Sequence, residues 1–197
     1  MDAADLRLIA DKKHDLLEAA QEARKLAYAP YSKFRVGAAL LLKWGEIILG
    51  ANMENASYGG TVCAERTAIA KAMMRSTSLS VDEAASGRKV EAGDIIAVAV
   101  ASDLEGSCSP CGFCRQVIRE FCSVHTRVLM VGRNWSRQSA QSATGTAPSS
   151  QQQQQQQQQV EDRQGKEFDE ANVECVTLDY LLPMSFGPED LDKPRHT

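Results

Sequence analysis

Pro-Cys-Gly-Phe-Cys at residues 110–114 and Cys-Ala-Glu at residues 63–65 place three cysteines and one carboxylate in two short motifs. Cys111 and Cys114 stand three positions apart, so two sulfurs can meet one ion across a single helical turn. Cys63 adds a third sulfur from far upstream in the chain. Zinc held by three thiolates keeps a fourth position open, and water in that position has a pKa near neutrality. We therefore expect one zinc ion per chain, held by these three cysteines.

The residues beside the first cysteine add chemistry to the predicted metal site. Glu65 follows Cys63 by two positions, and a carboxylate beside the metal can act first as a base and then as an acid. Arg66 is next, and we expect its guanidinium to donate hydrogen bonds to sulfur and to offset the negative charge of three thiolates. Both cysteine segments are predicted to begin helices, whose N-terminal ends lower the pKa of a thiol. The pattern predicts Glu65 as the catalytic residue.

Two plainer interpretations of these cysteines stay open at this point. Cys108 precedes Cys111 by three positions, so four cysteines could close a structural zinc site with no open position. The cysteines could also be ordinary buried thiols, with Glu65 complementing a helix dipole. We favour the open site, because a closed one leaves Glu65 without a task. Cys122 and Cys175 are expected in the core.

Composition narrows the class of protein. With 197 residues and 43% hydrophobic residues, the chain is expected to form a single domain, 1–197. The net charge of −4 and the absence of a basic stripe argue against a nucleic-acid partner. We see no signal peptide, and no apolar run is long enough to span a bilayer. Six cysteines in such a chain favour thiols and metal over disulfides, so we expect the cytoplasm.

Hydrophobic patterning predicts strands broken by helices, which is typical of a layered α/β domain. Residues 43–46 read as a hairpin turn between two of the strands. Helices are predicted at 15–29, 63–74 and 112–121, with a short helical turn at 178–183, and strands at 36–42, 47–52, 95–101, 127–131 and 172–177.

Two further stretches look like inserts. Residues 75–93 are rich in serine, alanine and charge, and we expect a surface loop. Residues 133–172 are of low complexity and contain consecutive glutamines at 151–159. Such a tract buries too little apolar surface to offset its conformational entropy, so we expect disorder there.

Five blocks, in order along the chain, resemble the small zinc-dependent cytidine deaminase family. They are residues 31–40, 52–58, 63–68, 110–116 and 181–191. The resemblance implies a three-layer α/β/α fold with a mixed five-stranded sheet. It also implies zinc-dependent hydrolytic deamination of cytidine and deoxycytidine to uridine and deoxyuridine, in pyrimidine salvage, with Glu65 moving the protons.

The resemblance further implies substrate contacts and an assembly. Asn52 and Glu54 match residues that bind the ribose hydroxyls, Phe34 matches one that packs near the base, and the Ala64 backbone lies where the base edge docks. Phe186 matches an aromatic side chain that reaches a neighbouring subunit, which implies a homotetramer with shared active sites. The substrate-binding residues implied in this way are Phe34, Asn52, Glu54, Ala56, Tyr58, Ala64 and Phe186.

Other functions were weighed against this one. The residues alone would make Asn52 a turn residue and Glu54 a solvated charge. An aminohydrolase acting on a cytosine-bearing antibiotic or on polynucleotide cytosine would share the scaffold, and so would a zinc module without activity. The sugar-binding block and the tail with Phe186 favour a nucleoside substrate, while the low basic content argues against a polynucleotide. The presence of Glu65 argues against an inactive module.

Overall fold

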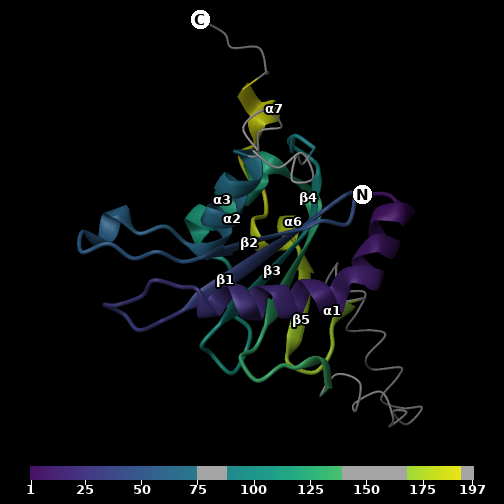
Figure 1. Cartoon of the computed structure of the whole chain (residues 1–197). Helices are drawn as coiled ribbons and strands as arrows, with labels where there is room; N and C mark the ends of the chain where they lie inside the picture. The colour runs from purple at the N-terminus through teal and green to yellow at the C-terminus, as the bar shows by residue number, and fades with distance from the viewer. Residues whose placement is uncertain (75–87, 139–167, 192–197) are drawn as a thin grey trace, which may run out of the picture.

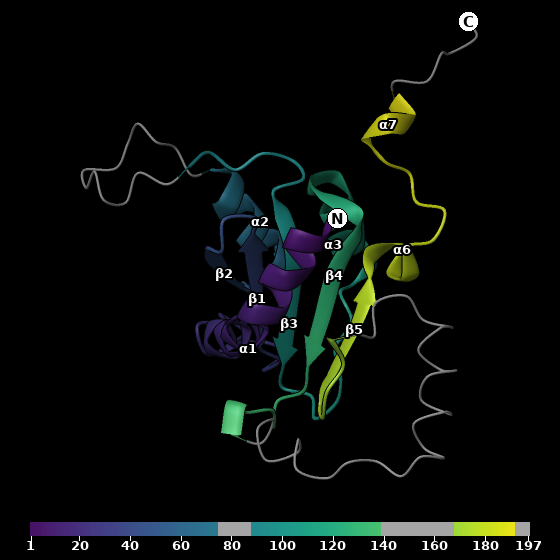
Figure 2. The ribbon, with the colours of Figure 1, turned by 90° about the vertical axis from the view of Figure 1, so that its right-hand side faces the viewer.

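The sheet is the centre of the molecule. A computed structural model describes residues 1–74, 88–138 and 168–191, and Figure 2 shows five strands side by side in the order β2-β1-β3-β4-β5. β3 and β4 pair in parallel, while the other three pairs are antiparallel. The mixed five-stranded sheet is therefore confirmed. The strands are β1 (Val36–Leu42), β2 (Ile47–Ala51), β3 (Ile95–Ser102), β4 (Cys122–Val131) and β5 (Val173–Thr177).

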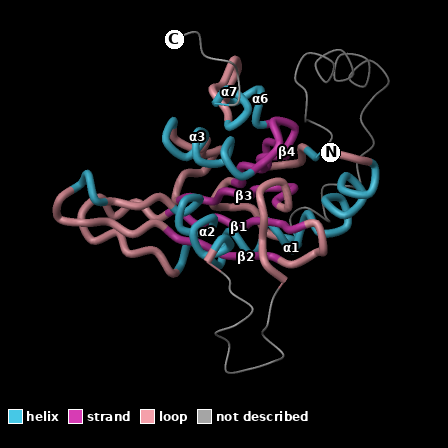
Figure 3. Tube along the Cα trace, turned by 90° about the horizontal axis from the view of Figure 1, so that it is seen from above, coloured by secondary structure: helices cyan, strands magenta, loops and turns pink. Residues whose placement is uncertain are grey.

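Helices cover both faces of this sheet. α1 (Ala3–Lys25) crosses one face, and α2 (Ala64–Met73) and α3 (Gly112–Phe121) lie on the other, as the edge-on view in Figure 3 and the view in Figure 1 show. The three-layer α/β/α arrangement expected from the resemblance is confirmed. Three short helical turns complete the described elements: η1 (Tyr58–Gly60), α6 (Leu178–Leu181) and α7 (Pro188–Leu191). No helix within the described residues has the length and apolarity needed to cross a membrane.

Successive side chains of β1 point to opposite faces of the sheet and pack into two different hydrophobic clusters. Leu41 packs with Leu17 of α1 in one buried cluster. Leu40 packs with Ala68 and Ile69 of α2 in the other. Successive side chains of a strand point to opposite faces, so an unbroken apolar run is what a strand covered on both sides requires.

The first helix is longer at its start than the sequence pattern indicates. It was predicted at 15–29 and runs over Ala3–Lys25, because Asp2 caps it by accepting hydrogen bonds at 2.9 Å from the backbone N–H groups of Ala4 and Asp5. The Asp5 side chain accepts from the Asp2 N–H in return, which completes a capping box. The buried face of α1 includes Ile9, which lies in the charged segment 1–14 where no helix was predicted.

A glycine in β2 lets α2 approach the sheet closely. A Cβ at Gly50 would lie 2.4 Å from the backbone N of Ala68 and 2.5 Å from the backbone O of Ala64. No side chain fits in that space. The first turn of α2, which carries part of the predicted site, is therefore seated directly against β2.

The two predicted inserts lie largely outside the described residues. This holds for 75–87 of the first insert and for 139–167 of the second, including the glutamine tract at 151–159. The described flanks of the second insert each contain a buried aromatic side chain. Trp135 is 6% exposed and Phe168 is 8% exposed, and both belong to the core beneath α1. The core therefore extends into both ends of the low-complexity stretch.

Candidate metal and substrate site

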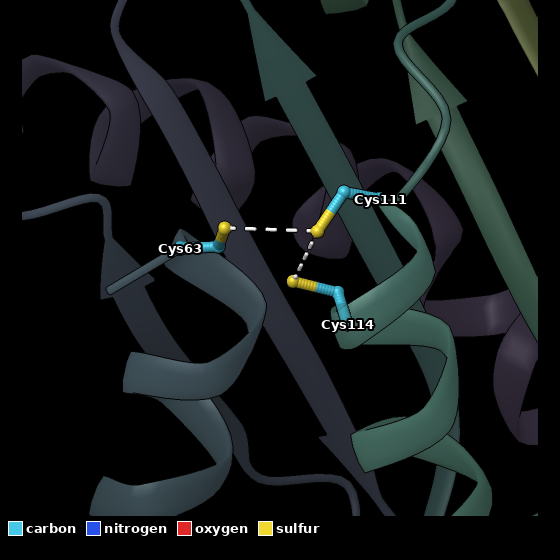
Figure 4. Close-up of side chains that lie close together, drawn as sticks. All are labelled: Cys63, Cys111 and Cys114. Carbon is cyan, nitrogen blue, oxygen red and sulfur yellow. Dashed lines mark hydrogen bonds between the residues drawn. The ribbon is translucent and has the colours of Figure 1, made fainter. Parts of the chain in front are cut away.

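Three cysteine sulfurs converge where two helices begin. Cys63 is the N-cap residue of α2, Cys111 is the N-cap residue of α3, and Cys114 lies in the first turn of α3. The Sγ atoms of Cys63 and Cys111 are 3.8 Å apart, and those of Cys111 and Cys114 are 3.5 Å apart. Figure 4 shows the three side chains pointing toward one another from the two helices.

The spacing of the sulfurs suits one zinc ion. All three Sγ atoms lie within 4.8 Å of one another. A tetrahedral zinc site with Zn–S distances of ~2.3 Å places its sulfurs ~3.8 Å apart, which is close to the separations observed. Within the described part of the chain, the group holds no fourth His, Cys, Asp or Glu. Cys108 is thus not part of it, which leaves the closed four-cysteine site without support.

The protein groups around Cys63 favour its thiolate form. Hydrogen bonds from the Cys114 thiol, from Arg66 and from Cys111 lower the pKa of Cys63 to about 5, against the opposing effect of burial. The same contact with Cys63 and burial raise the pKa of Cys114. Zinc binds thiolates, so Cys114 must lose its thiol proton to act as a ligand.

Glu65 lies beside the sulfurs, in the first turn of α2. Its side chain is 3% exposed, and its Oε2 atom accepts a hydrogen bond of 3.4 Å from the Cys114 Sγ atom. Burial raises the pKa of the Glu65 carboxyl. A carboxyl with a raised pKa in this position can hold a proton and release it again.

Arg66 lies on the outer side of the sulfurs. Its Nη2 atom donates to the Thr61 backbone O at 3.0 Å and lies 3.6 Å from the Cys63 Sγ atom. The hydrogen bond to Cys63 raises the pKa of Arg66. Its Nε atom is buried and has no protein partner in the described structure. The guanidinium thus places positive charge against the sulfur that carries the negative charge.

A cavity of about 220 Å³ adjoins the sulfurs. It brings predicted metal ligands and predicted sugar-binding residues together, and its lining comes from five separate segments of the chain. Its lining comprises Ser32, Phe34, Val36, Asn52, Glu54, Thr61, Cys63, Glu65, Val100, Cys108, Ser109 and Cys111.

Asn52 and Glu54 are both 9% exposed, and both hold the backbone of the neighbouring segment. Asn52 donates to the Phe34 backbone O at 3.0 Å and accepts from the Val36 N–H at 2.8 Å. Glu54 accepts from the Tyr31 N–H at 2.9 Å and also from the N–H and hydroxyl groups of Ser32. These hydrogen bonds lower the pKa of Glu54, the Ser32 hydroxyl most of all. Glu54 is therefore a nearly buried anion rather than a solvated charge.

Four of the predicted substrate-binding residues do not line this cavity. Ala64 is buried as the first residue of α2, and Ala56 is exposed. Tyr58 is 66% exposed, with its ring 5.9 Å from that of Tyr31 in an edge-on arrangement. Phe186 is 57% exposed, and its backbone O accepts a 3.0 Å hydrogen bond from Gln116 of α3.

Several lining residues carried no sequence prediction. Val36 and Val100 come from the ends of β1 and β3, Ser109 directly precedes the Pro-Cys pair, and Ser32 lies two residues before Phe34. The two serines could have been found from the sequence, because both lie within two residues of a predicted motif. The valines read only as core residues of strands.

Comparison with known proteins agrees with this geometry. Residues 10–131 match the family described as the cytidine and deoxycytidylate deaminase zinc-binding region. The chain belongs to this family. A cytidine deaminase from Halalkalibacterium halodurans is 48% identical over 115 residues, which cover 58% of this chain and 76% of that protein. One from Sporosarcina psychrophila is 48% identical over 108 residues, covering 55% and 68% of the two chains.

Solved structures of family members share the fold. The crystal structure of a cytidine deaminase from Burkholderia pseudomallei superposes with a TM-score of 0.60 at 32% identity, covering 88% of this chain and 98% of that one. One from Mycobacterium tuberculosis gives a TM-score of 0.53 at 26% identity, covering 88% and 95%. The family match, together with the three converging sulfurs, makes the chain a zinc hydrolase of the cytidine deaminase type.

Proposed function

We propose that this chain hydrolyses cytidine and deoxycytidine to uridine and deoxyuridine with release of ammonia. The observation that carries the proposal is that one cavity is lined both by Cys63, Cys111 and Glu65 and by Asn52 and Glu54. A metal-activated water and a nucleoside can meet in such a cavity. The names of the relatives at 48% identity support the same substrate.

Glu65 is the proton carrier in this proposal. Cys63, Cys111 and Cys114 would hold a zinc ion, which would supply a water nucleophile at neutral pH. Glu65 would take one proton from the attacking water and deliver it to N3 of the pyrimidine, and would then move the second proton from the oxygen added at C4 to the amine, which leaves as ammonia. Since the side chain is 3% exposed, bulk water does not compete for the proton.

The far end of the cavity suits the sugar. Asn52 uses one N–H and one lone pair on the backbone, so one N–H and one lone pair of its amide stay available. Glu54 accepts three hydrogen bonds, and a carboxylate has about four acceptor positions. The two side chains together thus offer one donor and two acceptors to ribose hydroxyls, and their backbone contacts hold them still.

The middle of the cavity suits the base. Phe34, Val36 and Val100 provide apolar surface for the flat faces of the ring. The Cys63 side chain makes no capping hydrogen bond to α2. Ala64 is the first residue of α2, so its N–H has no acceptor within the helix, and we propose that it binds an acceptor on the base edge.

We also propose that the active unit is a homotetramer with shared active sites. Phe186 is 57% exposed and lies outside its own chain's cavity, while Gln116 holds its backbone against α3. Large apolar side chains gather in the same C-terminal segment, with Tyr180 at 46% and Leu191 at 57% exposure. An exposed aromatic held in this way can enter a neighbouring subunit's site, alongside Tyr58 and Ala56.

The proposed compartment is the cytoplasm. All six cysteines are free thiols in the structure. Free thiols and a thiolate metal site persist in a reducing compartment.

A substrate panel tests the proposed function. Zinc-loaded protein is incubated with cytidine, deoxycytidine, free cytosine, deoxycytidine monophosphate and a single-stranded oligodeoxycytidine, and each deamination is followed by ultraviolet absorbance. We expect turnover of the two nucleosides and little with the others, because Asn52 and Glu54 offer contacts to the sugar and Glu54 repels a phosphate. Preferred turnover of the oligonucleotide, or none of either nucleoside, would contradict the proposal.

A further inference from the structure

The side chain of Arg115 in α3 joins segments that the mechanism above leaves unconnected. Its Nε atom donates to the Pro110 backbone O, its Nη2 atom to the Ser109 Oγ atom and its Nη1 atom to the Leu181 backbone O. All three hydrogen bonds are 2.7 Å long. They use each nitrogen of the guanidinium for a different acceptor.

Two of these acceptors belong to the wall of the substrate cavity. Ser109 lines the cavity directly, and Pro110 immediately precedes the zinc ligand Cys111, which lines it too. Leu181 ends α6, after which the chain continues toward Phe186. Arg115 therefore ties the wall of the cavity to the start of the C-terminal segment.

The contact also fixes the direction of the Ser109 hydroxyl. A hydroxyl has one hydrogen to donate and two lone pairs, while a guanidinium only donates. Because Arg115 occupies a lone pair of the Ser109 Oγ atom, the Ser109 hydrogen points elsewhere and can be donated to an acceptor in the cavity.

The segment between β3 and Cys111 is held at its other end by a separate set of contacts. Asp103, directly after β3, accepts from the Arg35 side chain at 3.1 Å and 3.0 Å and from the Arg35 backbone N–H at 2.9 Å. Residues 104–107 between these two anchors are exposed. Arg115 thus holds the end of this segment that leads into Cys111, through Ser109 and Pro110.

We propose that Arg115 is a positioning residue for the deamination, which sets the Ser109–Cys111 wall of the cavity against the C-terminal segment. The inference rests on the proposed function. Lysine cannot replace arginine here, because one ammonium cannot reach three acceptors that diverge around a planar fork. A shift of about 1 Å in a positioned group can lower a rate by ~10²-fold.

Arg119 offers a matched control on the same helix. It lies one turn further along α3 and donates to the Ser185 Oγ atom at 3.0 Å and to Glu189. It therefore holds the C-terminal segment as Arg115 does, but it has no part in the lining of the cavity. Comparing Arg115→Lys with Arg119→Lys separates loosening of the cavity wall from loosening of that segment.

The experiment measures kcat and KM for cytidine, equilibrium binding of uridine, zinc content and the thermal midpoint for the wild type and both variants. We expect Arg115→Lys to keep its zinc and to lose kcat by ~10- to 100-fold, with weaker uridine binding. Arg119→Lys should keep a kcat near that of the wild type. Millimolar methylguanidinium should restore part of the kcat of Arg115→Ala, as a purely structural role would not allow.

Three results would overturn the inference. They are a wild-type kcat in Arg115→Lys, an equal loss of kcat in both lysine variants, and the absence of any rescue by methylguanidinium. Failure of the proposed function looks different, because the zinc-loaded wild type would then turn over no cytidine at all.

Discussion

The Glu65 carboxylate lies 3.4 Å from the Sγ atom of Cys114, a residue 49 positions further along the chain and on another helix. This contact joins the two halves of the site, since Glu65 lies in the first turn of α2 and Cys114 in the first turn of α3. It places a buried acid next to a metal ligand while leaving that acid outside the ligand set. The arrangement is what a hydrolytic zinc enzyme needs for moving protons.

Removal of one sulfur should remove the metal. Cys114→Ala takes away one of three ligands, so we expect its zinc content to fall far below one ion per chain. Cys108→Ala is the matched control, because Cys108 lines the cavity without belonging to the sulfur group. Elemental analysis of both purified variants measures the effect. Full zinc in Cys114→Ala, or loss of zinc in Cys108→Ala, would show that the ligand set is different.

Glu65→Gln should separate metal binding from activity. Glutamine has a similar size but cannot accept and return a proton, so kcat should fall by ~10²- to 10⁴-fold. The zinc content should stay that of the wild type. Steady-state rates and elemental analysis on one preparation test both points, and substantial activity in this variant would rule out Glu65 as the proton carrier.

Gly50→Ala should disturb the seat of α2. The added Cβ would meet backbone atoms of Ala64 and Ala68 within 2.5 Å, and the backbone cannot rotate away. Overpacking of this kind lowers the free energy of unfolding by ~1–3 kcal/mol. Gly59→Ala is the control, since no atom lies within 4 Å of a Cβ there. Thermal unfolding of both variants measures the difference, and an equal midpoint in the two would refute the close approach.

Phe186→Ala should weaken nucleoside binding although Phe186 does not line the cavity of its own chain. Loss of an aromatic stack on a base costs ~1–3 kcal/mol. At ~1.4 kcal/mol per tenfold, the dissociation constant should rise about tenfold or more. Titration with uridine and a thermal midpoint on the same variant distinguish this from a structural role. A lowered midpoint with unchanged affinity would speak against a shared site.

Replacement of residues 139–167 by a short Gly-Ser bridge should leave deamination nearly unchanged. Both flanks are anchored on α1 independently of the segment between them: Arg137 pairs with Asp15 at 2.7 Å, and Glu170 pairs with Lys13 at 2.6 Å. Shortening a long loop changes the closure entropy only slightly. Turnover of cytidine and the elution volume on a calibrated column provide the test. A large loss of turnover would assign the segment a role in the active unit.

Continuous apolar runs and the spacing of cysteines made the central elements predictable. β1 and α3 have the predicted bounds of 36–42 and 112–121. The start of α1 was missed because its first residues are charged, and only the capping pair of Asp2 and Asp5 signals a helix there. β4 begins at Cys122 rather than at residue 127, because its first half alternates between buried and exposed residues and lacks an apolar run.

The site was only partly accessible to sequence reasoning. The roles of the cysteines and of Glu65 can be predicted from residue type and spacing. The roles of the other site residues depend on tertiary contacts, which the sequence does not show. Asn52 holds the backbone around Phe34 and Val36, and Arg115 contacts Leu181, 66 positions away. Contacts of this kind depend on the folded arrangement of distant segments, and no local pattern predicts them.

The most direct test is to titrate metal-free protein with zinc and to measure, at each step, uridine and ammonia formed from cytidine. The account predicts equal amounts of the two products and a rate that rises linearly until one zinc ion is bound per chain. It also predicts that Glu65→Gln binds the same amount of zinc and forms almost no product. If the fully zinc-loaded protein forms no uridine, or if Glu65→Gln forms it at the wild-type rate, the account is contradicted.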